Sequence, residues 1–154
     1  MKQIRFYQII TAVCCLLLMS CGIDKNLKKG EKFLALGEYY DAADQFKQAY
    51  TKTPSKERAS RGKIALKMAR CYDKINSTPK AIAAYRNAVR YNQASIDDRL
   101  AYARLLLKNG EYKQAEKEFR ILVDSMPNNI LAQNGLKSAQ MAPIWKKAGS
   151  RYQV

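Results

Sequence analysis

Histidine is absent from this 154-residue sequence, which removes the commonest catalytic base and the commonest metal ligand. No glycine-rich phosphate loop follows a predicted strand, and no pair of carboxylates falls in a recognisable motif. Only 4 prolines and 7 glycines are present, so we expect no long disordered or collagen-like stretch. The sequence offers no catalytic, cofactor-binding or metal-binding residues. We therefore expect a chain that is not an enzyme and uses no cofactor.

The first 20 residues have the composition of a bacterial lipoprotein signal peptide. Lys2 and Arg5 form a basic start, and the apolar run after them is far shorter than the roughly 20 residues that a membrane-spanning helix needs. The run ends in the lipobox-like tetrapeptide Leu18-Met19-Ser20-Cys21, with a small residue before the cysteine that accepts the lipid. We expect cleavage before Cys21 and attachment of diacylglycerol and a fatty acid such as palmitate. The alternative is an ordinary signal peptide or an uncleaved anchor.

Cysteine is scarce in the rest of the chain, where Cys71 alone follows Cys21. A single thiol makes no internal disulfide, and the apolar surroundings of Cys71 predict a small buried side chain. Acidic residues are also few, at 13 against 28 lysines and arginines, and the formal net charge is +15. Because the leader predicts export, we expect anionic lipid, acidic proteins or anionic envelope polymers as partners, and no nucleic acid.

Three segments share a pattern of small and large residues. Equivalent alanines at Ala42, Ala81 and Ala115 are separated by 39 and 34 residues, and the second spacing is that of the tetratricopeptide repeat (TPR). The pattern resembles a TPR array, in which small residues let paired helices approach and large residues fill the space beside them. The same registers recur at small Gly30, Ala69 and Ala103, and at large Phe33, Tyr72, Leu106, Phe46, Tyr85 and Phe119.

This resemblance implies an all-α fold over residues 21–140: a right-handed TPR solenoid of three helix-turn-helix repeats plus a C-terminal capping helix. Gly37, Asn76 and Gly110 suit the left-handed residue that ends a helix, and Pro54 and Pro127 suit the helix stops. Gln93 stands where the second repeat lacks such a proline, so the end of that helix is less defined. The spacing of 39 predicts five inserted residues, which we expect in a longer connection at residues 55–60.

Residues 141–154 differ in kind from the repeats. Residues 130–141 have the pattern of a capping helix, whereas the segment after them is basic and aromatic and shows no helical period past Pro143. Residues 151–154 alternate like the start of a strand. We expect either that this tail packs back through Trp145 or that it leads into another domain.

The concave face of a TPR array is lined mainly by the first helix of each pair. Projecting the registers places Glu31 and Leu34 there, together with eight residues of the second and third repeats. The basic members of that set predict two rows, Arg70 with Arg104 and Lys74 with Lys108. These rows would hold carboxylates of an extended partner segment, with leucines contacting its apolar side chains. The alternative is that they form ordinary solvated faces. The eight residues are Lys63, Leu66, Arg70, Lys74, Leu100, Arg104, Leu107 and Lys108.

The lipobox, the repeats and the junction at residues 145–152, Trp-Lys-Lys-Ala-Gly-Ser-Arg-Tyr, together resemble the N-terminal part of a Bacteroidota lipoprotein family. These proteins join TPR, β-propeller and OmpA-like domains, and the PorE-like members belong to the type IX secretion system. The resemblance implies an outer-membrane lipoprotein that faces the periplasm and binds protein partners during assembly or anchoring of the secretion machine. The segment that resembles the junction is residues 141–154. Peptidoglycan binding belongs to the OmpA-like domain and is not expected of this chain alone.

Two other functions remain open on the same residues. One is a TPR assembly lipoprotein of an outer-membrane insertion or pilus machine, and the other is a periplasmic chaperone-like module that holds extended clients. No run of acidic residues follows Cys21, where Gly22-Ile23-Asp24-Lys25 stands. Because surface export signals in these bacteria are acidic, we expect the periplasmic leaflet rather than the cell surface.

Overall fold

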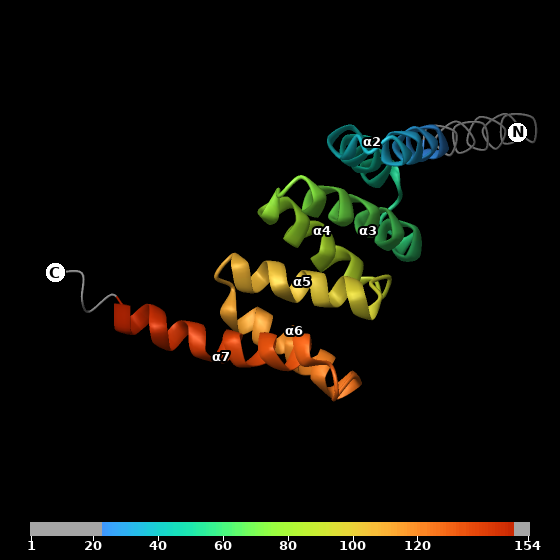
Figure 1. Ribbon diagram of the computed structural model, residues 1–154. Coiled ribbons are helices and arrows are strands. Elements are labelled where there is room, and N and C mark those ends of the chain that lie inside the picture. Colours follow the sequence, from blue (N-terminus) through green and yellow to red (C-terminus); the bar gives the residue numbers. More distant parts are fainter. Residues whose placement is uncertain (1–22, 150–154) are drawn as a thin grey trace, which may run out of the picture.

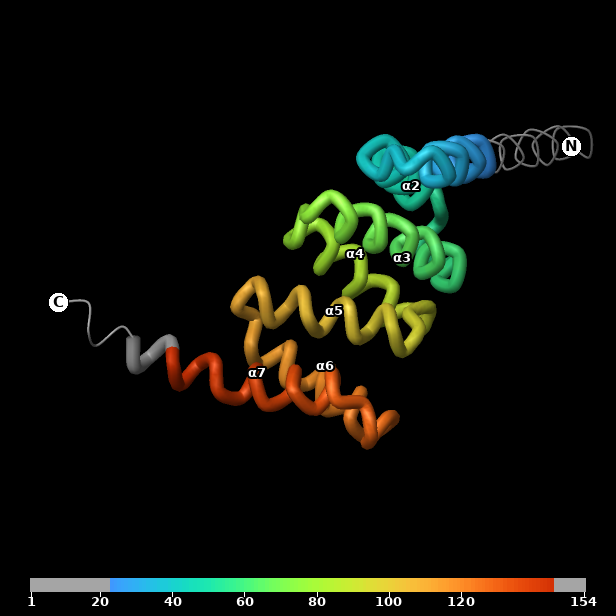
Figure 2. Tube along the Cα trace, in the orientation of Figure 1, coloured from blue at the N-terminus to red at the C-terminus, as the bar shows by residue number. Residues whose placement is uncertain are grey.

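The computed structural model describes residues 23–149, and these form seven helices and no strand (Figure 1). The leading helix spans residues 23–35, and α3, α5 and α7 follow it along the stack (Figure 1). The leading helix and α7 lie at opposite ends of that stack (Figure 2). The expected fold, three helix pairs and a capping helix, is confirmed. The later helices are α2 (Tyr39–Lys52), α3 (Arg58–Lys74), α4 (Thr78–Arg90), α5 (Ile96–Lys108), α6 (Tyr112–Ser125) and α7 (Ile130–Gly149).

Small residues bring the helices together as the repeat pattern predicts. Ala42, Ala81 and Ala115 are fully buried at the start of α2, α4 and α6, and the aromatic residue four positions later in each helix is buried beside them. Gly30 of the leading helix lies so close to Phe46 that an added Cβ would stand 2.6 Å from its ring. Burying one Phe or Leu side chain stabilises a fold by about 1.5–3 kcal/mol. The buried contacts between these small and aromatic residues are therefore the main source of stability.

Four helices end in the same way, at a residue with left-handed backbone. Gly37, Asn76 and Gly110 have φ of 76°, 55° and 81°, as predicted. Asn92, with φ of 54°, was not predicted, and it ends α4 as sharply as the others. After it, the amide of Gln93 donates to the carbonyl of Ala88 at 2.9 Å, the bond of a Schellman motif. The expectation of a poorly defined end at Gln93 is therefore wrong.

The insertion lies inside helices and not in a longer connection. The connections 53–57 and 91–95 both have five residues. By contrast, α2 and α3 have 14 and 17 residues, whereas α4 and α5 have 13 each. The predicted longer connection is thus wrong, because most of the added residues extend the start of α3, from residue 58, by about one turn.

Arg61 explains how this extra turn is held. Its Nη1 donates to the carbonyl of Thr53 at 2.7 Å and to that of Tyr50 at 3.3 Å. Its guanidinium also lies 4.0 Å from the centre of the Tyr50 ring. A cation at these carbonyls neutralises the partial negative charge at the end of α2. The chain then leaves α2 in an extended conformation at Thr53, as the residue before Pro54 prefers.

The tail departs from two sequence expectations, a helical period that ends at Pro143 and packing through Trp145, whereas a continuation into another domain stays a prediction. Helix α7 passes through Pro143 and continues to Gly149. Pro143 lies at an exposed position inside this helix, where its ring removes one backbone hydrogen bond. Trp145 is 63 % exposed and does not pack back onto the array. The strand expected at residues 151–154 lies outside the described residues.

No helix within residues 23–149 has the length and apolar character that crossing a bilayer would require.

We predict that Gly135→Ala destabilises the array, although alanine favours a helix by about 1 kcal/mol over glycine. An added Cβ at this position in α7 would stand 2.2 Å from Cε1 of the buried Phe119 ring. Overpacking of this kind costs about 1–3 kcal/mol, measurable by urea denaturation. Ser138→Ala on the exposed face of the same helix is the control and should be neutral or stabilising. A Gly135→Ala protein as stable as the control would show that α7 is loosely docked.

Candidate functional site

Helices α3 and α5 carry all eight residues predicted to form a partner-binding groove. Lys63, Lys74, Arg104 and Lys108 are exposed to solvent, as a binding role requires. The predicted leucines behave differently, since each is partly buried against the core and presents only part of its side chain. These leucines are Leu66, Leu100 and Leu107.

Arg104 and Lys108 share a hollow between α3 and α5 with a volume of about 300 Å³. Asp73 of α3 lines the same hollow, and Ala101 and Leu105 of α5 form the apolar part of its wall. Arg104 and Lys108 lie one turn apart on α5, so their charges point to the same side. The hollow therefore has a local excess of positive charge and an apolar wall, which suits a carboxylate next to an aliphatic group.

Arg70 does not form a free cationic row with Arg104. Its Nε and Nη2 donate to the two carboxylate oxygens of Asp98 at 2.8 and 2.9 Å, across the junction between α3 and α5. This bidentate geometry is the strongest form of an arginine–carboxylate pair. The prediction that Arg70 is available to a partner is therefore wrong, because its charge is neutralised within the array. Lys74 and Lys108, the second predicted row, form no ion pair within residues 23–149.

Asp98 is the residue that sequence reasoning missed. Its carboxylate also accepts the Ser95 hydroxyl at 2.6 Å and the Ser95 amide at 3.0 Å, which completes a capping box at the start of α5. Burial alone would raise the pKa of Asp98, but the hydrogen bonds from Arg70 and Ser95 outweigh it and hold the pKa below its usual value. The signal was present in the sequence as serine followed three residues later by an acid.

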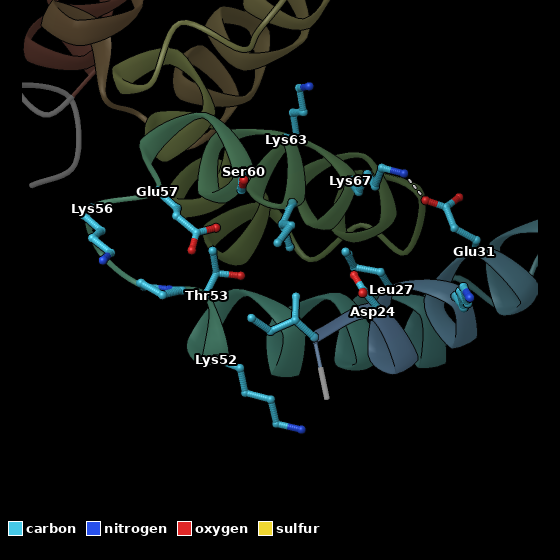
Figure 3. A pocket seen from close by; sticks show the side chains of 14 residues that line it. Asp24, Leu27, Glu31, Lys52, Thr53, Lys56, Glu57, Ser60, Lys63 and Lys67 are labelled. Carbon is cyan, nitrogen blue, oxygen red and sulfur yellow. Dashed lines mark hydrogen bonds and ion pairs between the residues drawn. The ribbon is translucent and has the colours of Figure 1, made fainter. Parts of the chain in front are cut away.

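Lys63 lies in a second and larger hollow, of about 600 Å³, between the leading helix, the end of α2 and the start of α3 (Figure 3). Apolar side chains such as Leu27 and Ile64 line part of it. An ion pair between Lys67 and Glu31 stands at one end, so Glu31 is also occupied within the array (Figure 3). The predicted continuous groove is thus divided into two hollows. Lys63 belongs to the larger hollow, and Arg104 and Lys108 belong to the smaller one.

No group of three or more potential metal-ligating His, Cys, Asp or Glu residues occurs between residues 23 and 149. Cys71 is fully buried, and burial raises the pKa of its thiol to about 11, which keeps it protonated and unreactive at neutral pH. The site is therefore a pair of polar-rimmed hollows on a rigid helical stack.

Residues 76–139 match the family model of the tetratricopeptide repeat. The chain contains a TPR region. The match covers α4, α5, α6 and the first part of α7, so it includes the α5 side of the Arg104–Lys108 hollow but not α3. TPR domains are protein-interaction modules, and the fold is that of a binding scaffold.

Solved TPR domains of low sequence identity share the whole fold. The second TPR domain of human RPAP3, in complex with the HSP70 peptide SGPTIEEVD, is 15 % identical with a TM-score of 0.60, covering 79 % of this chain and 98 % of that chain. The first TPR of Spaghetti (RPAP3), bound to the HSP90 peptide SRMEEVD, is 18 % identical with a TM-score of 0.60 and covers 81 % and 95 %. The Sgt2 TPR domain from Aspergillus fumigatus is 18 % identical with a TM-score of 0.57 and covers 83 % of each chain.

One curated relative is more similar in sequence. DnaJ homolog subfamily C member 3 from Gallus gallus is 32 % identical over 141 residues, which is 86 % of this chain. The chain spans 27 % of that protein's length, about a quarter. The likeness therefore concerns one segment of a much longer protein.

We predict that Asp98→Asn lowers the free energy of unfolding by about 1–3 kcal/mol at pH 7, because the buried capping and arginine interactions lose their charge. Since the folded-state pKa of Asp98 lies below its unfolded value of about 3.9, its stabilisation is complete above that value. It is lost as the pH falls through the folded pKa. The difference in the free energy of unfolding between wild type and variant should therefore disappear in acid.

Urea denaturation between pH 7 and pH 3 measures this difference. Asp97→Asn at the exposed neighbouring position is the matched control and should cost only about 0.3–1 kcal/mol. A difference for Asp98→Asn that persisted unchanged at pH 3 would contradict the assigned role.

Proposed function

We propose that this chain is a lipid-anchored TPR scaffold of the cell envelope that holds an extended acidic segment of a partner protein. The observation that carries the proposal is the pair Arg104 and Lys108, two exposed cations that line one hollow between α3 and α5. Lys74, also exposed, lies at the corresponding register on α3. Guanidinium and ammonium groups in a partly apolar hollow bind carboxylates well, because charge-assisted hydrogen bonds are about twice as strong as neutral ones.

The peptides bound by two structural neighbours support this chemistry. Both SGPTIEEVD and SRMEEVD end in Glu-Glu-Val-Asp, a short extended sequence in which acids flank an apolar residue. In this chain, Leu100 and Leu107 lie on α5 beside Arg104 and Lys108 and keep part of their surface open. The leucines would contact an apolar residue of the partner while the cations meet the acids around it. The partner class we propose is therefore an acidic peptide segment with interspersed apolar residues.

The location rests on the N-terminal sequence. The lipobox at Leu18-Met19-Ser20-Cys21 supports attachment of lipid at Cys21. No run of acidic residues follows it in Gly22-Ile23-Asp24-Lys25, which supports the periplasmic face of the outer membrane. Together with the junction-like segment at residues 145–152, this favours a role in assembly or anchoring of a type IX secretion-like machine. The alternatives are an assembly lipoprotein of an insertion or pilus machine, and a chaperone-like module.

The double variant Arg104→Glu/Lys108→Glu should bind an acidic peptide at least tenfold more weakly than wild type. The physical reason is the reversal of two charges in the hollow, since each lost charge-assisted contact is worth about 1.5–3 kcal/mol. Isothermal titration with SGPTIEEVD as the probe measures this loss, and the neutralised peptide SGPTIQQVN should bind weakly to both proteins.

Lys113→Glu/Lys117→Glu is the matched control, because it reverses two exposed lysines one turn apart on α6. Circular dichroism should show that both variants keep the helical fold. Equal affinity of wild type and the Arg104→Glu/Lys108→Glu variant for the acidic peptide would refute the proposed site.

Wild-type protein should fractionate with the outer membrane and carry diacylglycerol on Cys21, whereas Cys21→Ser should lose both. Mass spectrometry of the mature N-terminus and membrane fractionation measure the two properties. Cross-linking in intact cells then separates the proposed roles. Stable links to secretion-ring proteins support the secretion role, links to insertion or pilus proteins support the first alternative, and a spread of unrelated clients supports the chaperone role. A wild-type protein without lipid on Cys21 would contradict the proposed anchor.

A further inference from the structure

Four lysines form one face of the leading helix, and we call this face the lysine stripe. They are Lys25, Lys28, Lys29 and Lys32, and all four are exposed. Their spacing of three, four and seven residues places them on the same side of an α-helix. Lys25–Lys29 and Lys28–Lys32 are like-charge pairs four residues apart, which weaken an isolated helix. Their repulsion costs stability, and the cation–π contact of the Lys29 ammonium, 5.6 Å from the centre of the Phe33 ring, offsets part of that cost.

The lysine stripe is held outward by contacts on the opposite side of the helix. Gly30 packs against the Phe46 ring, and Asn26 donates to Gln48 of α2 at 3.5 Å. The one acid of the helix that is paired, Glu31, lies on another side and binds Lys67 of α3. The rotation of the helix is therefore set by the core, and the stripe cannot turn inward.

None of the four lysines forms an ion pair within the described part of the chain. On α6, by comparison, Arg120 pairs with Glu116 one turn away. The lysine stripe thus presents only positive charge along about two turns of helix, over roughly 10 Å. Lys28 also lines the larger hollow beside Leu27, whereas Lys25, Lys29 and Lys32 are not part of its lining. The stripe as a whole suits a flat array of anionic groups.

We infer that the lysine stripe lies on the anionic headgroups of the bilayer to which Cys21 is attached. The choice of a lipid surface rests on the proposed anchor. Lys25 follows Cys21 by four residues, so the chain holds it within about 14 Å of the membrane surface. At this range the negative potential of anionic lipid acts on the stripe, because the Debye length is about 8 Å at physiological ionic strength. Each lysine near such a surface strengthens binding about fivefold. The stripe would orient the solenoid as well as attract it.

The full chain, expressed with its leader, is bound to vesicles of phosphatidylcholine alone or with phosphatidylglycerol. Acetylation of lysines by a soluble reagent is then read by mass spectrometry. The four stripe lysines should react at least threefold more slowly on the anionic vesicles, and high salt should abolish this protection. Lys113 and Lys117 on α6 should react equally on both. Equal acetylation of the stripe on the two vesicle types overturns the inference.

A variant set gives the second measurement. Lys25→Gln/Lys28→Gln/Lys29→Gln/Lys32→Gln should lose most of its preference for anionic over neutral vesicles, by at least tenfold in partition coefficient. The control Lys80→Gln/Lys113→Gln/Lys117→Gln/Lys137→Gln removes the same charge from exposed lysines elsewhere and should keep the preference. Equal loss in both variants would mean that net charge, and not the stripe, determines binding.

Failure of this inference is distinguishable from failure of the proposed anchor. A chain that binds both vesicle types without protection of the stripe lysines would support the proposed anchor and contradict this inference. A chain that carries no lipid but binds anionic vesicles through the stripe would contradict the anchor and support the contact of the stripe with anionic lipid. Protection of the stripe on neutral vesicles by added RNA or by an acidic protein, with none from anionic lipid, would assign the face to that partner instead.

Discussion

Close approach of paired helices at small residues is the constraint on which the rest of the structure depends. Ala42, Ala81 and Ala115 are fully buried, and the aromatic side chains next to them fill the space that the small residues leave. A helix pair of this size cannot bury its apolar side alone, so each repeat is stable only when stacked on its neighbour. The stack positions α3 next to α5, and the Arg104–Lys108 hollow exists because of that placement.

Charge serves two separate purposes in this chain. Part of it joins repeats, since Lys67 pairs with Glu31 of the leading helix and Arg70 pairs with Asp98 of α5. These pairs connect successive helices on the side of the array that was expected to bind a partner. The remaining exposed cations include the Arg104–Lys108 pair and the lysine stripe. Each internal ion pair removes one cation and one acid, so the net charge of +15 is unchanged and pairing decides only which cations are free for partners.

Sequence rules predicted a local conformation reliably where the residues that determine it lie close together in the sequence. Gly37, Asn76 and Gly110 were predicted at the helix ends because a left-handed residue is a local requirement. Asn92 obeys the same rule and was missed because proline was taken as the expected stop. The insertion was counted correctly, but it was expected in a loop and it lengthens helices instead. Whether extra residues lengthen a helix or a loop depends on Arg61 reaching the end of α2, a contact that spacing does not reveal.

The amino-acid sequence by itself determined the helical class, the pairing of helices and the burial of their small and large residues. It did so because these follow from periodicity and from the size of side chains within one repeat. Only the tertiary structure decided which cations are free. The eight predicted groove residues were placed correctly on α3 and α5, but Arg70 turned out to be occupied by Asp98, 28 residues further on. A charge pattern shows which residues share a face, whereas the partner of each charge depends on how neighbouring repeats are stacked.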